Sequence, residues 1–193
     1  MKKVGLYFGS FNPVHTGHLI IAEYFATRTE LDEVWLVVSP QNPFKVNSDL
    51  APEQHRLEMV KLAIHDNPIL QTCAIEFELE KPSYTVNTLR VLSKNFPKYS
   101  FTLLIGEDNI PSFHKWMEYE FILDNYAVRV FPRLHNSNRS EIRLIGKDVK
   151  MVDAPLIEIS STYIRESIKL GKSIRYLTSD VVVNYIKKLG LFQ

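Results

Sequence analysis

Short apolar runs alternate along the chain with stretches whose apolar residues recur at helical spacing. Apolar side chains occupy alternate positions of residues 3–8, which predicts a buried strand. Residues 18–29 place Ile21 and Phe25 about one helical turn apart, which predicts a helix, and residues 34–38 are again strand-like. A strand, a crossover helix and a second strand favour a parallel sheet with a right-handed connection.

The same alternation continues to the end of the chain. The pattern predicts strands or extended segments at 70–79, 100–105, 127–131 and 149–152. It predicts helices at 53–65, at 83–95 with Ser83 as the N-cap, at 116–124, at 161–170 and at 180–188. Long polar loops are expected over 39–52 and through Asn138. We therefore expect an α/β fold, a doubly wound parallel sheet in a single domain over 1–193, with a small helical part from about residue 155.

Composition narrows the class of protein. The 193 residues carry a net charge of +1 without a run of like charge, which argues against a nucleic-acid binder. The single Cys73 and the absence of an N-terminal signal pattern favour a cytoplasmic protein without disulfides. No apolar run reaches the ~20 residues that cross a bilayer, so no membrane partner is expected. The sequence does not set the oligomeric state and leaves a homo-oligomer open.

Ligands of doubly wound folds bind where the carboxyl ends of the strands meet helix N-termini. The first such junction reads GSFNPVHTGH over residues 9–18, and it is neither the dinucleotide fingerprint nor the P-loop. Gly9 lets the backbone approach a ligand, and Gly17 leaves amides near the helix start open to an anion. His15 and His18 can donate to phosphate oxygens there. A metal pair would need further ligands, so phosphate is favoured and no metal site within the protein is predicted.

The junction resembles the Gly-x-Phe-Asn/Asp-Pro-x-His-x-Gly-His signature of the nucleotidyltransferase superfamily. This resemblance implies a Rossmann-like fold and in-line attack of a phosphate on the α-phosphorus of a nucleoside triphosphate, with pyrophosphate leaving. It also implies that Mg²⁺ accompanies ATP and that His15 and His18 are the catalytic residues. Such a transfer needs positioning and stabilisation of negative charge more than covalent chemistry.

Four further segments are similar, in the expected order, to those of the bacterial nicotinate mononucleotide adenylyltransferases. They are PQNPFK at 40–45, PSYT at 82–85, IGED at 105–108 with Trp116, and ISSTYIR at 159–165. The resemblance implies that AMP passes from ATP to nicotinate mononucleotide, giving deamido-NAD and pyrophosphate.

Carried over position by position, the resemblance also implies two sets of binding residues. The ATP site comprises Gly9, Ser10, Phe11, His15, His18, Gly106, Asp108, Ser160, Ser161, Thr162 and Arg165. The nicotinate mononucleotide site comprises Asn12, Lys45, Tyr84, Thr85 and Trp116, with amides at the Tyr84–Thr85 helix start receiving the nicotinate carboxylate. Arg133 lies where the family often has an arginine near the adenosine, although the flanking match is loose.

Simpler interpretations exist for some of these residues. Trp116 alone reads as a core residue, Lys45 as a solvated cation, and Ser160 with Arg165 as a helix cap and a surface cation. Two positions depart from the family pattern, because Asn12 replaces a common Asp and Phe44 replaces a common His.

Two rival functions remain at this stage. An adenylyltransferase for another acceptor, such as phosphopantetheine, is disfavoured by the PSYT segment and Trp116. A nucleotide-sensing protein without turnover is disfavoured by the intact His15, His18 and Arg165, together with Lys45.

Overall fold

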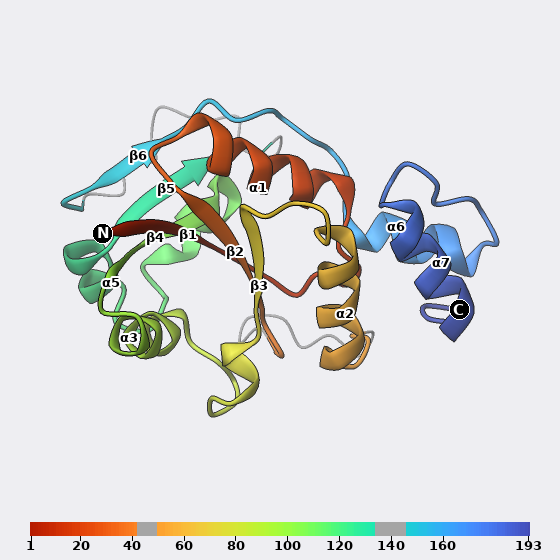
Figure 1. Cartoon of the computed structure of the whole chain (residues 1–193), viewed down its shortest axis with the longest axis horizontal. Helices are drawn as coiled ribbons and strands as arrows, with labels where there is room; N and C mark the ends of the chain where they lie inside the picture. The colour runs from red at the N-terminus through yellow and green to blue at the C-terminus, as the bar shows by residue number, and fades with distance from the viewer. Residues whose placement is uncertain (42–49, 134–145) are drawn as a thin grey trace.

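A six-stranded parallel sheet forms the centre of the protein, as Figure 1 shows. The computed structural model describes residues 1–41, 50–133 and 146–193. The strands are β1 (Lys2–Gly9), β2 (Glu33–Val38), β3 (Leu70–Cys73), β4 (Tyr99–Gly106), β5 (Ala127–Phe131) and β6 (Val149–Met151). Their order is β3-β2-β1-β4-β5-β6, and every neighbouring pair is parallel. The predicted doubly wound, Rossmann-like sheet is confirmed.

The helices lie on both faces of this sheet. They are α1 (Thr16–Arg28), α2 (Glu53–Ala63), α3 (Thr85–Asn95), α4 (Ile110–Phe113), α5 (Tyr119–Asn125), α6 (Ser161–Lys169) and α7 (Asp180–Leu189), with short 3-10 turns at Ile75–Phe77 and Glu107–Asn109. In Figure 1 the chain runs from β6 over α1 to reach α6 and α7, which lie at one end of the molecule beside α2. None of the helices in the described ranges is long and apolar enough to cross a membrane.

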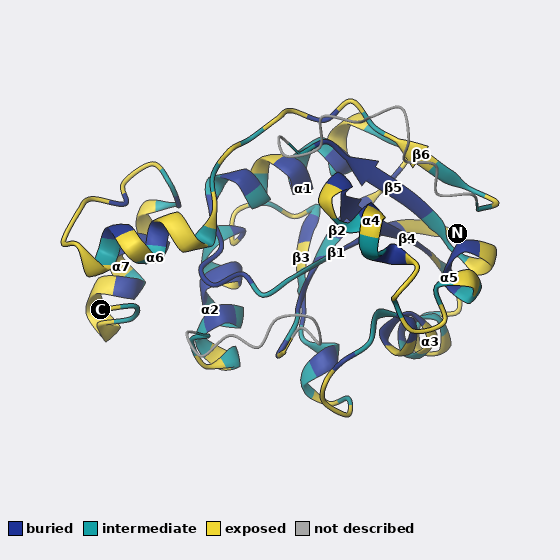
Figure 2. Ribbon diagram, turned by 180° about the vertical axis from the view of Figure 1, so that it is seen from behind, coloured by how far each residue is buried: buried dark blue, intermediate teal, exposed yellow. Residues whose placement is uncertain are grey.

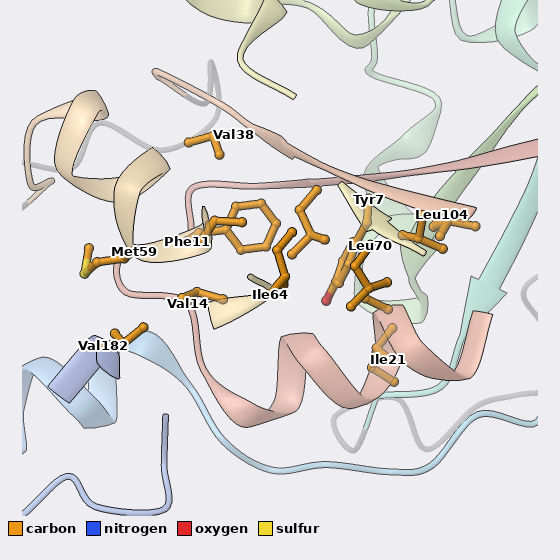
Figure 3. Close-up of a cluster of buried hydrophobic side chains, with 14 of the residues drawn as sticks. Tyr7, Phe11, Val14, Ile21, Val38, Met59, Ile64, Leu70, Leu104 and Val182 are labelled. Atoms are coloured by element: carbon orange, nitrogen blue, oxygen red, sulfur yellow. The ribbon is translucent and has the colours of Figure 1, made fainter. Parts of the chain in front are cut away.

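Each face of the sheet carries its own hydrophobic cluster. Figure 3 shows the first, in which Tyr7 and Phe11 from the β1 side meet Ile21 of α1, Met59 of α2 and Val182 of α7. The second cluster joins β4 to α3, α4 and α5. The central strands are buried on both faces, as the dark colour of the sheet in Figure 2 shows. Burial on both sides is what a parallel sheet requires of its apolar strands.

Three predicted elements were wrong in part. The extended segment predicted over 70–79 ends at Cys73, because the chain turns into the 3-10 segment Ile75–Phe77. Ser83 does not cap α3; the N-cap is Tyr84, and the Ser83 hydroxyl donates instead to Glu76 at 2.8 Å. The helix predicted over 116–124 begins only at Tyr119, so that Trp116 lies in the turn between α4 and α5.

A buried arginine fastens the far edge of the sheet. Arg129 on β5 donates from Nη2 to Glu30 Oε1 at 2.6 Å. Its Nη1 donates to Asp148 Oδ1 at 2.9 Å, and its Nη2 to Asp148 Oδ2 at 3.1 Å. The planar guanidinium thus ties the turn after α1 to the segment before β6. A lysine has no such fork of donors.

We expect Arg129→Lys to lower the free energy of unfolding by about 1–3 kcal/mol, because hydrogen bonds to both carboxylates are lost. Chemical denaturation of the two proteins measures the difference. An unchanged midpoint would show that the forked hydrogen bonds of the guanidinium add no stability beyond what a lysine supplies.

Candidate active site at the carboxyl end of the sheet

A cleft of about 940 Å³ opens at the carboxyl ends of the strands, where the connections from β1 and β4 leave in opposite directions along the sheet. This is the position at which doubly wound folds bind ligands. The predicted site residues that line it are Gly9, Ser10, Asn12, His15, His18, Tyr84, Thr85, Gly106, Asp108, Trp116, Ser160, Ser161, Thr162 and Arg165. These predicted residues come from four of the five sequence segments and meet in one cleft. Lys45 and Phe44 lie outside the described residues.

His15 and His18 cap α1 reciprocally. The His18 backbone N–H donates to His15 Nδ1 at 3.3 Å, and the His15 backbone N–H donates to His18 Nδ1 at 3.2 Å. The two rings stack with their centroids 3.6 Å apart. Because each Nδ1 accepts a hydrogen bond, each neutral imidazole carries its proton on Nε2. Both rings line the cleft, so the Nε2–H groups remain as donors for a ligand.

The surroundings of this pair keep both rings uncharged. His15 is only 3% exposed. Burial, with a smaller effect of the Arg133 charge, lowers its pKa from 6.5 to about 4. The pKa of His18 is lowered well below 6.5, first by burial and then by the charges of His15 and Arg133. At neutral pH the pair therefore donates hydrogen bonds without titrating.

Gly17 and Phe11 shape the space around the histidines. A Cβ at Gly17 would approach His15 Nδ1 to 3.0 Å and Ile157 Cγ2 to 3.2 Å, so glycine allows the ring to lie against the helix start. Phe11 is 1% exposed, and its ring lies edge-on to His18 with 5.0 Å between centroids. Phe11, a predicted site residue, is not among the residues that line the cleft, and its side chain packs against His18 instead.

Later parts of the chain hold the carbonyl groups of the junction. The Ser39 N–H donates to Gly9 O at 2.9 Å, and Arg165 Nη1 donates to Asn12 O at 3.0 Å. The Ser161 and Thr178 hydroxyls, each at 2.9 Å, donate to the carbonyls of Pro13 and Val14 respectively. Each of these carbonyl oxygens already accepts a hydrogen bond from the protein, so its partial negative charge repels a bound phosphate less.

The N-termini of three longer helices, α1, α3 and α6, border the cleft, as does the start of the four-residue helix α4. None of the three has an acidic residue in its first turn, whereas α2, α5 and α7, whose first residues lie outside the cleft lining, each have one. Helix N-termini carry partial positive charge and attract anions. The cleft is therefore prepared for more than one negatively charged group.

The start of α3 is especially open to an anion. Its N-cap, Tyr84, makes no side-chain capping bond. The neighbouring Ser83 and Thr88 hydroxyls donate to Glu76, each at 2.8 Å, so neither competes for the helix end. Glu76 is 2% exposed and lines the cleft, and sequence reasoning missed it because the strand before it was predicted to be too long. The signal was present, since Glu76 follows the carboxyl end of a strand.

At α6 the predicted helix cap is confirmed. Ser160 Oγ accepts from the Tyr163 N–H at 3.1 Å. Arg165, one turn on, lines the cleft and also donates to Asn12 O, so its guanidinium is already fixed against the junction. Arg133 also lines the cleft, with Nε 3.8 Å from Asp108 Oδ1. Two arginines thus supply positive charge to the site.

Trp116 and Asn12, two residues of the predicted acceptor site, each contact the protein as well as line the cleft. Trp116 is half-buried against Phe113, with ring centroids 4.8 Å apart, and it also lines the cleft. It is therefore packed on one side and accessible to a ligand on another.

Asn12 Oδ1 accepts from the Ala51 N–H at 3.0 Å, a bond that an Asp oxygen would make equally. The departure from Asp at this position keeps the acceptor.

The described residues offer no cluster of three or more His, Cys, Asp or Glu side chains that could hold a metal ion. A second hollow, of about 910 Å³, lies between α1 and residues 153–156 and contains none of the predicted site residues. The chemistry suggested by the sequence is concentrated in the cleft at the end of the sheet.

Comparisons with known proteins find relatives over most of the chain. The model of the cytidylyltransferase-like family matches residues 6–167. A Cytophaga hutchinsonii protein named "probable nicotinate-nucleotide adenylyltransferase" is 54% identical over 184 residues, which cover 95% of each chain. A Flavobacterium psychrophilum protein of the same name is 48% identical over 191 residues, which cover 99% of each chain.

Solved structures show the same fold. Plasmodium falciparum nicotinic acid mononucleotide adenylyltransferase complexed with NaAD superposes with a TM-score of 0.81 at 20% identity, covering 100% of this chain and 98% of that one. A Vibrio parahaemolyticus protein described as a putative nicotinate-nucleotide adenylyltransferase gives a TM-score of 0.73 at 23% identity, covering 100% and 96%.

We expect His15 and His18 to be neutral at pH 6 and above, with the proton on Nε2, and ¹⁵N NMR of the imidazoles tests this directly. The unfolded chain takes up protons at these positions below about pH 6.5, whereas folded His15 does so only near pH 4. This difference makes the folded state progressively less stable as the pH falls from 6.5 to about 4. Midpoints near 6.5 for both rings in the folded protein, measured beside the denatured chain, would contradict the capping geometry.

Proposed function

The chain belongs to the cytidylyltransferase-like family, and from this premise we propose that it is a nicotinate-nucleotide adenylyltransferase. It transfers AMP from ATP to nicotinate mononucleotide and produces deamido-NAD and pyrophosphate. The observation that carries the proposal is the cleft bordered by the His15–His18 pair and by the N-termini of α1, α3 and α6, none of which has an acidic residue in its first turn. Such a cleft suits two substrates that bring phosphates and a carboxylate.

The chemistry explains why the histidines need not titrate. An oxygen of the acceptor phosphate attacks the α-phosphorus of ATP, and the bond from that phosphorus to the bridging oxygen of the pyrophosphate breaks. A phosphate monoester is already ionised at neutral pH, with a second pKa of ~6, so no base is required. His15 and His18 donate from Nε2 to oxygens whose charge changes in the transition state.

The remaining cleft residues divide between the substrates in this proposal. The start of α6, with Ser160, Ser161 and Arg165, receives the triphosphate of ATP, while Asp108 accepts from ribose hydroxyls. The open start of α3 receives the nicotinate carboxylate, and Trp116 stacks on the pyridine ring.

Mg²⁺ enters this scheme with ATP, as part of that substrate. It neutralises charge on the phosphate oxygens. We also propose that the reaction takes place in the cytoplasm. We treat residues 1–193 as one domain, because Ser161 and Thr178 of the C-terminal part donate hydrogen bonds to the junction after β1.

Purified protein supplied with Mg²⁺ and ATP is expected to release pyrophosphate with nicotinate mononucleotide and to use the nicotinamide form less efficiently. A carboxylate at a helix N-terminus gains ~0.3–2 kcal/mol that a neutral amide does not. The measurement compares kcat/KM for the two acceptors, with phosphopantetheine as the unrelated acceptor. Binding of both substrates without pyrophosphate release would indicate a sensing protein. Equal kcat/KM values for the two mononucleotides would show that the start of α3 does not recognise the carboxylate.

Two substitutions of His18 separate its capping role from its donor role. Asn can offer a side-chain oxygen near the position of Nδ1 and keep the cap, but it has no donor at the position of Nε2. We expect His18→Asn to fold with little loss of stability and to lower kcat ~100-fold, the typical cost of one preorganised donor, with KM for ATP little changed. His18→Gln, which restores a donor near Nε2, should recover part of kcat. A kcat of His18→Asn within threefold of wild type would show that the donor lies elsewhere.

Trp116→Ala is expected to raise KM for nicotinate mononucleotide more than KM for ATP, because ring stacking is worth ~1–3 kcal/mol. Trp116→Phe keeps an aromatic face and should recover most of the loss. Steady-state kinetics and thermal melting are measured on both variants. A large fall in melting temperature with both KM values raised together would show that Trp116 stabilises the core and does not stack on the acceptor.

A further inference from the structure

Arg56, on α2, is buried in a way that charged side chains seldom are. It is 1% exposed and is the largest of the fully buried side chains in the described part of the chain. It does not line the cleft. No carboxylate of the described residues lies within ion-pair distance of it, although a buried charge is normally paired. The guanidinium is satisfied instead by backbone carbonyls.

Four carbonyl oxygens surround this guanidinium. Nη1 donates to Ser10 O at 2.7 Å and to Ser39 O at 2.6 Å. Nη2 donates to Pro40 O at 2.9 Å, and Nε donates to Ala51 O at 2.9 Å. One side chain therefore connects the junction after β1, the segment after β2 and the start of α2. Arginine alone has the fork of donors that can reach several acceptors in this way.

Two of the segments that Arg56 connects contribute residues to the lining of the cleft. Ser10 and Ser39 both line it, while Arg56 approaches their carbonyls from within the protein. The hydrogen bond from the Ser39 N–H to Gly9 O marks the end of the β1–β2 ladder. Beyond that point Arg56 replaces the missing ladder bonds and keeps the two segments in register.

We propose that Arg56 is a positioning residue for the adenylyl transfer, which fixes the junction that carries His15 and His18 against the segment after β2. This inference rests on the proposed function for its reaction, but its geometry is independent of that function. By engaging the Ser10 and Ser39 carbonyls, Arg56 holds their negative ends away from the substrate phosphates. In-line transfer is sensitive to such placement, because a misalignment of 1 Å can cost ~100-fold in rate.

Arg56→Lys and Arg56→Gln test the proposal, with Arg129→Lys as the matched control. Arg129 is a second buried arginine, which lies away from the cleft and is paired with carboxylates. At a temperature where all proteins are folded, we expect both Arg56 variants to lower kcat roughly 10- to 100-fold. Both KM values should change less than threefold, because α3 and α6 still hold the substrates. Arg129→Lys should lose stability and keep its kcat within twofold.

A second readout needs no turnover. The imidazole resonances of His15 and His18 report the junction directly, and they should shift in Arg56→Lys but not in Arg129→Lys. An inactive wild type would overturn the proposed function alone. Unchanged histidine resonances, or a kcat within threefold of wild type, would overturn the positioning role. A failure of both Arg56 variants to fold at the assay temperature would also overturn it, because Arg56 would then be required for folding rather than for positioning.

Discussion

The cleft depends on how the backbone between β1 and α1 is held. Its carbonyls accept from side chains that arrive from distant parts of the chain: Arg56 on α2, Ser161 and Arg165 on α6, and Thr178 before α7. A loop of this length has no secondary structure to satisfy its polar groups, and buried carbonyls without donors are costly. The bonds therefore stabilise one conformation of the loop, and that conformation places the histidine pair.

Electrostatic preorganisation follows from this arrangement. The positive ends of α1, α3 and α6 border the cleft without acidic residues in their first turns, and Arg133 and Arg165 add full charges. His15 and His18 remain neutral because burial and the nearby Arg133 charge oppose protonation. The site thus stabilises negative charge with dipoles and hydrogen-bond donors that are fixed before the substrate arrives, and such groups need no reorganisation during the reaction.

Three buried charged residues illustrate how the fold uses polarity. Arg129 is satisfied by two carboxylates at the edge of the sheet, and Glu76 by two hydroxyls beside the start of α3. Arg56 is satisfied by carbonyls alone. Each arrangement fixes separate segments with a geometry that apolar packing would leave less defined. The two nearer the cleft, Arg56 and Glu76, hold segments that line it.

The sequence by itself determined the layered fold and most of the predicted residues that line the cleft, because periodicity and short motifs are local properties. Alternation of strand and helix patterns predicted the doubly wound sheet, and the segment at 9–18 indicated phosphate chemistry. Only the tertiary structure decided that His15 and His18 cap each other, and that Ser83 serves Glu76 rather than α3. Burial and partners far apart in sequence decide such matters, because a hydrogen bond between distant residues leaves no periodic trace in the chain.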